Sequence, residues 1–292
     1  MIHLDTGNLL GARSPDQIAN YLTDIGDLDA AREFTLAAAG GQSLALPSKP
    51  YTQTGVVIGF IPTAGARLSP VIGMSQLKAD AALIGTSIKI TLDKFYVAEY
   101  PGLGKHSILC EFSGKNQVVG EAEQLSFALQ LEAGDKSSAG ITGAPIFMGL
   151  CVAPDGISFK GKTVNVKSSL DDAIVQALDA PAFKDGLTLL HTAQPALKPF
   201  TALSAAMVRA VANKRRNCEV HLFNLGLDFG AGTTSARLRC GSYIVVQTDA
   251  GQQWDWSHYE WNVDGSSLQS KGNPQKPLDF NYMVLGVAPF SS

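Results

Sequence analysis

Apolar and polar side chains alternate with a period of two through much of the stretch from 86 to 167, and this pattern restricts the fold more than any other feature. The clearest run has four apolar residues on one face, namely Leu125, Phe127, Leu129 and Leu131. The opposite face carries Gln124, Ser126, Gln130 and Glu132. Since successive side chains of a strand point to opposite faces, the run predicts an antiparallel strand with one buried and one solvated face.

Further strands flank this one. Residues 88–92 alternate in the same way, and a change of phase near Asp93–Lys94 predicts a β-bulge. Residues 145–152 are more uniformly apolar. The Asp155–Gly156 pair between them and 157–166 is a turn sequence and predicts a hairpin.

Strand patterns return after a gap and continue to the end of the chain. Residues 218–229 alternate between apolar and polar side chains. The Asp264–Gly265 pair predicts a second hairpin, between 259–263 and 266–269. The apolar run 282–288 is typical of a central strand, which is buried on both faces.

Two short helices are expected at the start. Ser14, Pro15 and Gln17 have the sequence of a capping box with proline in the first helical position. Gly26 can end this first helix, and Asp27 can cap a second one. Each helix has one narrow apolar stripe, so both should pack against other parts of the protein.

The segment 168–217 interrupts the strands with helical patterns. Ser169 and Asp172 have capping-box spacing, and a later helix should open at Pro199. The residues of that helix expected to face inward are Phe200, Leu203, Met207, Ala210 and Val211.

Together these elements predict a mixed, mainly β protein: an antiparallel β-sandwich with two N-terminal helices and a helical insertion. The expected parts are an N-terminal helical segment (1–48), a β-rich first half (49–167), the helical insertion (168–217) and C-terminal strands that complete the sandwich (218–292). The expected core comprises Ile90, Leu92, Phe112, Leu125, Phe127, Leu129, Val164, Phe223, Leu225, Val245, Val284 and Leu285.

The net charge and the lengths of the apolar runs limit which partners and which cellular compartment we expect for this protein. The chain has 23 basic and 26 acidic residues, a net charge of −3, so we do not expect it to bind nucleic acid. The apolar run 55–61 ends at Pro62, far short of the ~20 residues that a transmembrane helix needs. The N-terminus has no basic segment before an apolar run, and the cysteines form no CxxC pair. We therefore expect a cytoplasmic protein with reduced thiols.

Neither the GxSxG motif of serine hydrolases nor the HExxH motif of zinc proteases occurs in the sequence, and we expect no cofactor and no metal. Because catalytic groups meet in space, one enzymatic alternative stays open. It is a cysteine-dependent hydrolase in which Cys110, Cys218 or Cys240 pairs with a distant histidine.

The stretch 50–77 is unusually poor in charge, with only Lys49 and Arg67 between Phe34 and Leu77. One interpretation is an internal strand with connections packed on the body of the protein. A second is an apolar contact surface for another copy of the chain or for another protein. A third, peripheral association with a membrane, is the remaining alternative.

The segment 254–261 holds all three tryptophans, and its candidate contact residues are Trp254, Asp255, Trp256, His258, Tyr259 and Glu260. If extended, Trp254, Trp256, His258 and Glu260 would share one face. Such a cluster is consistent with aromatic packing, with a protein contact surface or with a small-ligand platform. We expect Trp254 to be exposed and Trp261 to be buried. The leading functional hypothesis is a non-catalytic binding or assembly protein that contacts itself or another protein.

Overall fold

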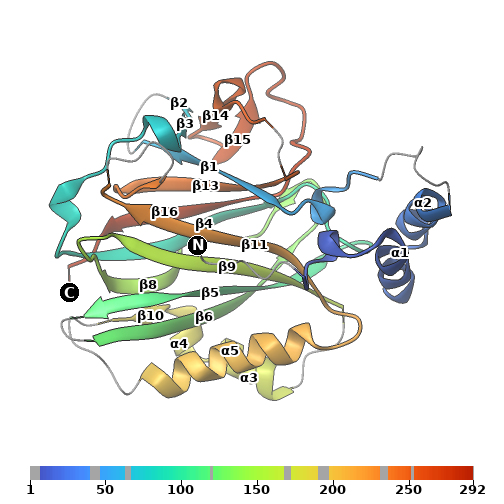
Figure 1. Cartoon of the computed structure of the whole chain (residues 1–292), viewed down its shortest axis with the longest axis horizontal. Helices are drawn as coiled ribbons and strands as arrows, with labels where there is room; N and C mark the ends of the chain where they lie inside the picture. Colours follow the sequence, from blue (N-terminus) through green and yellow to red (C-terminus); the bar gives the residue numbers. More distant parts are fainter. Residues whose placement is uncertain are drawn as a thin grey trace.

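The computed structural model describes residues 7–39, 47–62, 67–118, 121–167, 172–189, 197–230, 236–250 and 253–291. Within these residues the chain forms three β-sheets in layers, with helices along one sheet edge and a helical hairpin at one end (Figure 1). The prediction of a mainly β protein built around an antiparallel sandwich is confirmed.

The central layer is an eight-stranded sheet, in which β7 (Ser137–Ser138) pairs with β4 beside the main path. The path runs β10 (Leu187–Thr188), β8 (Ala144–Cys151), β4 (Ser87–Val97), β16 (Tyr282–Pro289), β13 (Gly241–Thr248), β1 (Gly55–Ile61) and β3 (Ile72–Gly73). The C-terminal strand β16 is thus central, as its apolar sequence predicts.

Two further sheets lie on opposite faces of this layer. The five-stranded sheet has the order β12 (Ala236–Arg237), β11 (Cys218–Asp228), β9 (Ile157–Val166), β5 (His106–Val118) and β6 (Glu121–Ala133). The three-stranded sheet has the order β15 (Ser267–Ser270), β14 (Tyr259–Asn262) and β2 (Leu68–Pro70).

The main core fills the space between the eight-stranded and five-stranded sheets. All twelve residues expected in the core are buried except Leu129, which is partly buried and packs against it. A second, smaller core lies on the other face of the eight-stranded sheet, where Ile244, Val246 and Val284 meet Trp256 and Leu268. Strands β13 and β16 are therefore apolar on both faces because each face contributes to a different core.

Of the predictions made from local turn and bulge sequences, two are confirmed and one is wrong. The bulge at Asp93 is present, since Lys94 pairs with Val284 and Leu92 with Leu285. The Asp264–Gly265 hairpin joins β14 to β15 as predicted. The Asp155–Gly156 hairpin prediction is wrong, because the turn passes the chain from β8 in one sheet to β9 in the other. A turn sequence predicts that the chain reverses its direction locally, but it does not predict which strand each flanking strand pairs with.

The N-terminal helices α1 (Pro15–Asp24) and α2 (Leu28–Ala39) form a hairpin at one end of the sandwich (Figure 1). The capping box at Ser14 is complete, because its hydroxyl accepts from Gln17 N and its own N–H donates to the Gln17 side chain. Gly26 ends α1 with φ +86°, and Asp27 caps α2 by accepting from Ala30 N.

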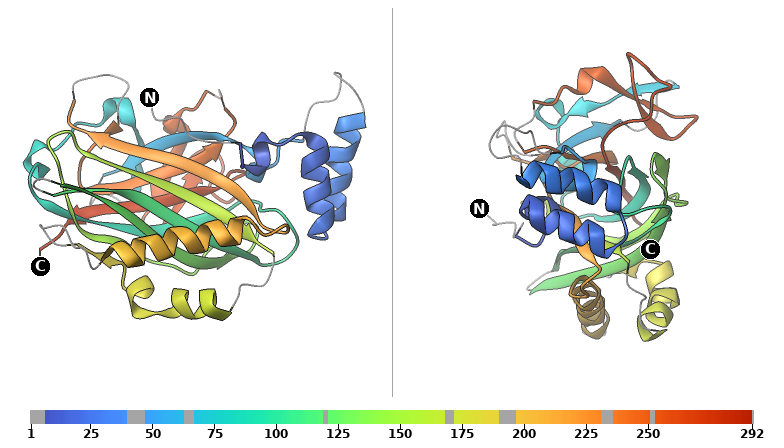
Figure 2. Two further views of the ribbon diagram at one scale, coloured as in Figure 1. Left: turned by 60° about the horizontal axis from the view of Figure 1, so that its bottom comes forward. Right: turned by 90° about the vertical axis from the view of Figure 1, so that its right-hand side faces the viewer.

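The helices α3 (Asp172–Asp179), α4 (Pro181–Lys184) and α5 (Lys198–Ala212) lie at the edge formed by β6 (Figure 2). The predicted cap at Ser169 lies outside the described residues. The inward face predicted for α5 is partly wrong, since Leu203 is 46% exposed and Ala210 is also exposed. The buried face is formed by Thr201, Ser204, Met207, Val208 and Val211.

Short 3₁₀ turns complete the described structure, at Leu10–Ala12, Pro50–Thr52, Met74–Gln76, Ala81–Leu83 and Trp256–His258. Among the described residues, no helix combines the length and the apolar character needed to cross a bilayer.

Candidate aromatic binding site

The tryptophan segment forms one connected cluster of rings on the three-stranded sheet. Trp254 stacks on Tyr259, with centroids 5.1 Å apart and planes 11° from parallel. Trp256 and Phe280 meet the Trp254 ring edge to face, at 5.4 and 5.0 Å. Such pairs stabilise a cluster by about 0.5–1.5 kcal/mol beyond the area they bury, so the Trp254 ring has a fixed orientation.

The local backbone differs from the extended strand considered in the sequence. Asp255 accepts from Ser257 N at 2.8 Å and caps the 3₁₀ turn Trp256–His258. This turn rotates the side chains, so the shared face expected for Trp254, Trp256, His258 and Glu260 does not form. Trp256 points inward and is 8% exposed, whereas Trp254 and Trp261 are both half-buried. The expected contrast between an exposed Trp254 and a buried Trp261 is therefore wrong.

The polar candidates of the segment also separate. The His258 side chain is 74% exposed and lies 3.8 Å from the Asp255 carboxylate. The hydrogen bonds from Ser257 lower the pKa of Asp255 below its usual range. Glu260 instead accepts from Gln269 Nε2 at 2.8 Å within the β14–β15 hairpin. Glu260 thus has a local partner in the sheet.

Two clefts lie beside the Trp254–Tyr259 stack. The first, called here the aromatic cleft, has a volume of about 360 Å³ and is lined by Ser48, Gln53, Thr248, Asp249, Trp254, Tyr259, Asp279 and Phe280. The second has a volume of about 530 Å³ and is lined by Gln253, Trp254, Asp255, His258 and Tyr259. The same two rings therefore contribute to both clefts.

Most of the residues that line the aromatic cleft could not be identified from the sequence. Gln53, Asp249 and Asp279 come from three distant parts of the chain, brought together by the order β16, β13 and β1 in the central sheet. Asp279 precedes the strand next to β13, and Asp249 follows β13 itself. The only available signal was the acidic residue at the end of each apolar run.

Two polar atoms of the cleft residues are buried without a hydrogen-bond partner among the described residues. They are the indole Nε1 of Trp254 and the side-chain oxygen of Gln53. Buried polar groups are almost always paired, and an unpaired one costs about 1–3 kcal/mol. An unpaired donor and an unpaired acceptor on residues of one cleft therefore favour a bound molecule over simple packing.

The apolar stretch 50–77 is used largely inside the protein, against the tryptophan segment. A Cβ at Gly59 would lie 2.7 Å from the Trp256 ring, so glycine is what allows the indole to approach β1. Strand β2 pairs with β14, with Ser69 opposite Trp261. In the described part of this stretch, Leu68 is the exposed large apolar residue, at 42%. The two segments singled out by composition thus form one structural unit.

The cysteines offer little nucleophilic chemistry. Cys110 is fully buried, and burial raises the pKa of its thiol far above the usual range. A bulge between Glu219 and His221 places Cys218 and His221 on the same face of β11, opposite Asn165 and Thr163, and not on opposite faces as simple alternation predicts.

Burial keeps this Cys218–His221 arrangement uncharged. It raises the pKa of Cys218 to about 11 and lowers the pKa of His221 to about 4. At neutral pH both groups are therefore uncharged, whereas cysteine catalysis needs a thiolate. Burial also raises the pKa of Cys151 and of Cys240.

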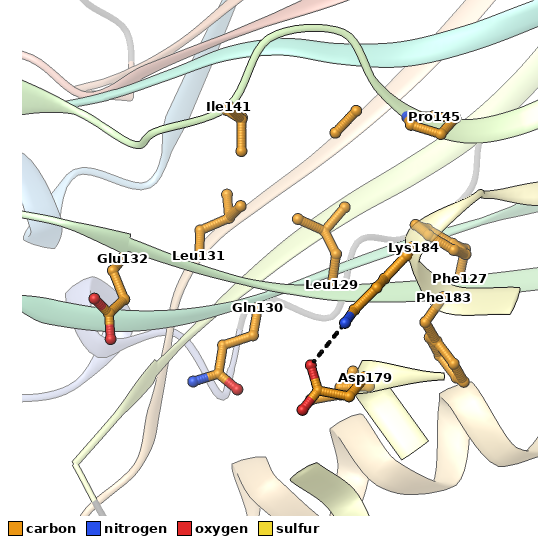
Figure 3. A pocket seen from close by; sticks show the side chains of 12 residues that line it. Phe127, Leu129, Gln130, Leu131, Glu132, Ile141, Pro145, Asp179, Phe183 and Lys184 are labelled. Carbon is orange, nitrogen blue, oxygen red and sulfur yellow. Dashed lines mark ion pairs between the residues drawn. The ribbon is translucent and has the colours of Figure 1, made fainter. Parts of the chain in front are cut away.

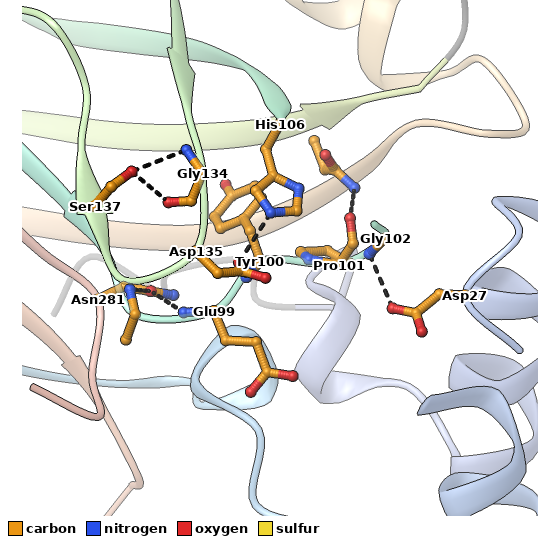
Figure 4. A network of polar contacts seen from close by, with 12 residues as sticks. Asp27, Glu99, Tyr100, Pro101, Gly102, His106, Gly134, Asp135, Ser137 and Asn281 are labelled. Carbon is orange, nitrogen blue, oxygen red and sulfur yellow. Dashed lines mark hydrogen bonds and ion pairs between the residues drawn. The ribbon is translucent and has the colours of Figure 1, made fainter. Parts of the chain in front are cut away.

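A buried polar network lies where the helical hairpin meets the sandwich (Figure 4). His106 Nε2 lies 2.9 Å from the Asp135 carboxylate, and its Nδ1 lies 3.5 Å from Lys167 Nζ. Burial lowers the pKa of Lys167, against the opposing effect of Asp135 and Asp27. This order of groups resembles a proton relay, but the His106 side chain is 0% exposed. A substrate therefore has no access to the His106 ring. Close by, Asp27 at the start of α2 accepts from Gly102 N at 3.1 Å, which links the hairpin to the sandwich.

Asn281 is the centre of the neighbouring part of this network. Its Oδ1 accepts from Ala98 N at 2.8 Å, and its Nδ2 donates to Gln247 Oε1 at 3.0 Å. Gln247 in turn donates to Gln53 O and Val220 O. We expect Asn281→Ala to lower the free energy of unfolding by about 2 kcal/mol, because it leaves buried groups unpaired.

Urea denaturation measures this effect, and Asn262→Ala is the control. Asn262 also donates to a glutamine, Gln269, but lies on the partly exposed hairpin, so its loss should cost under about 1 kcal/mol. Equal losses for the two variants would contradict the role assigned to Asn281.

An apolar cleft of about 410 Å³ opens at the edge of the sandwich (Figure 3). Its walls are the inward residues Phe127, Leu129 and Leu131 of β6, together with Phe183 of α4. The Asp179–Lys184 ion pair, with a 3.3 Å contact, lies at its rim. Apart from these apolar walls, nothing in its lining indicates a particular occupant.

No group of three or more histidine, cysteine, aspartate or glutamate side chains suited to a metal ion occurs in the described residues. Comparison of the chain with the models of known protein families, with curated proteins and with solved structures gave no match.

Proposed function

We propose that this chain is a non-catalytic binding protein and that the aromatic cleft is its contact site. The observation that carries the proposal is the pair of unpartnered buried atoms, Trp254 Nε1 and the Gln53 side-chain oxygen, on residues that line one cleft. A half-buried tryptophan held by neighbouring rings is also typical of binding hot spots, which combine a rigid aromatic anchor with partial exposure.

Other observations support this class over the two alternatives. The four thiols have pKa values raised by burial, which disfavours a cysteine hydrolase. The stretch 50–77 packs against the tryptophan segment, which leaves little of its described part for a membrane. The four cysteines form no disulfide, which suits the reducing cytoplasm, the compartment that we propose.

The test begins with the species that the protein carries when purified under native conditions from its source. Native mass spectrometry should show the chain with a bound small molecule, a second copy or another protein. Trp254→Ala should weaken that association by about 2 kcal/mol or more, the usual effect of losing a hot-spot tryptophan. Removal of Trp254 should change stability less than removal of the more deeply buried Trp256.

Leu203→Ala is the matched control, because Leu203 is an exposed apolar residue on α5 and does not line the cleft. It should leave the bound species unchanged. Retention of the same species by Trp254→Ala, at wild-type affinity, would count against the aromatic cleft as the contact site.

A further inference from the structure

The lining of the aromatic cleft combines aromatic rings with acceptor groups. Trp254, Tyr259 and Phe280 supply the rings. Asp249 and Asp279 are exposed carboxylates at the same cleft, and Gln53 adds an unpartnered buried oxygen. No lysine, arginine or histidine is among the described residues that line it. The cleft therefore has a negative field without a cation of its own.

The rings and the carboxylates favour the same kind of ligand. The face of an aromatic ring carries partial negative charge and attracts a cation, by about 0.5–2 kcal/mol depending on desolvation. Carboxylates add a longer-range attraction that salt screens. Asp279 acts on the Tyr259 hydroxyl as well, since burial and this neighbouring charge raise the pKa of Tyr259. The two carboxylates would repel an anionic ligand.

We infer that the aromatic cleft binds an organic cation through an ammonium group, either primary or alkylated. This inference rests on the proposed function, in which the cleft is the contact site. The ammonium group lies over the rings, and the carboxylates of Asp249 and Asp279 neutralise its charge. An N–H or hydroxyl group of the ligand donates a hydrogen bond to the Gln53 side-chain oxygen. A small amine and a lysine side chain of a partner present the same chemistry.

The experiment compares a cation with its neutral isostere. Choline and 3,3-dimethyl-1-butanol have nearly the same shape and differ in charge. Each is titrated into the full chain, with tryptophan fluorescence and the indole N–H signals in NMR as readouts. Choline should bind saturably and at least about tenfold more tightly than the alcohol, because only the cation gains from the rings and carboxylates.

Substitutions in the chain test whether choline binds in the aromatic cleft. Trp254→Ala should abolish the response, and Asp279→Asn should weaken choline binding about fivefold, with a smaller effect at high salt. Asp155→Asn removes the same charge from the connection between β8 and β9, and it should leave choline binding unchanged. Equal binding of choline and the alcohol, or equal effects of the two aspartate variants, would overturn the inference.

Two further ligands identify the source of the cation and separate the inference from the proposed function. N-acetyl-lysine amide binding more tightly than choline would support a partner's lysine side chain, and the reverse would support a free amine. Saturable, Trp254-dependent binding of the neutral sugar methyl glucoside, with no response to either cation, would overturn the cation and leave the binding function standing. With no response to either cation, the inference falls. The native mass measurement then decides the binding function.

Discussion

Replacing Trp256 with alanine should lower the free energy of unfolding by about 3–5 kcal/mol, the usual cost of removing a large buried ring. Trp256 is 8% exposed and joins the three-stranded sheet to the central sheet. Its ring lies against the positions of Gly59 and Gly73, and edge to face with Trp254. Urea denaturation of the purified variant measures the loss.

The glycine facing the ring provides an independent check of this packing. Gly59→Ala should cost about 1–3 kcal/mol in the wild-type chain, because the added carbon would lie 2.7 Å from the indole and from Val71. In the Trp256→Ala background the same change should cost much less, since the indole is gone and Val71 can shift. If the two changes are additive, Trp256 does not contact β1 as described.

The alanine variants of Trp254 and Trp256 should differ in their effects on stability and on binding. Trp254 stacks on Tyr259 at the surface of the cluster, so Trp254→Ala should cost less stability than Trp256→Ala while removing more of the binding. A Trp254→Ala loss of stability as large as that of Trp256→Ala would make the cluster a core element only.

The sequence predicts the β-sandwich well because burial of a strand leaves a direct mark on its residues. Leu125 to Leu131 alternate, and the residues facing the main core are all buried or partly buried. The capping box at Ser14 and the bulge at Asp93 are likewise local, and both are present. These features depend on neighbours within a few positions, so the sequence alone specifies them.

The errors arise where distant contacts decide the outcome. The Asp155–Gly156 turn is a true turn, but its two strands enter different sheets. Asp255 caps a 3₁₀ turn at Trp256–His258, and this turn changes the directions in which the side chains of the tryptophan segment point. Asp249 and Asp279 join the aromatic cleft only because β13 and β16 are neighbours. Strand order is a property of the whole chain, and no local pattern encodes it.

Acid should destabilise the protein through His221, the second large effect expected. This side chain is 4% exposed, and its Nε2 has no hydrogen-bond partner among the described residues. Burial lowers the pKa of His221 from 6.5 to about 4. Above pH 6.5 the folded and unfolded chains both hold a neutral imidazole, so the full stability is present. As the pH falls below 6.5, the unfolded chain takes up a proton that the folded chain cannot accept.

The stability lost between pH 6.5 and pH 4 through this one group is about 3 kcal/mol, since each unit of pKa shift corresponds to about 1.4 kcal/mol. His221→Leu should therefore flatten the acid side of the stability curve by that amount. At pH 7 it should change stability little, because the imidazole Nε2 has no partner to lose. His258→Leu makes the same substitution at a side chain that is 74% exposed, and it should keep the wild-type pH dependence. Urea denaturation at pH 7, 5.5 and 4 compares the three proteins. A His221→Leu curve parallel to wild type would mean that the imidazole is protonated in the folded state, which requires water or a carboxylate to reach it.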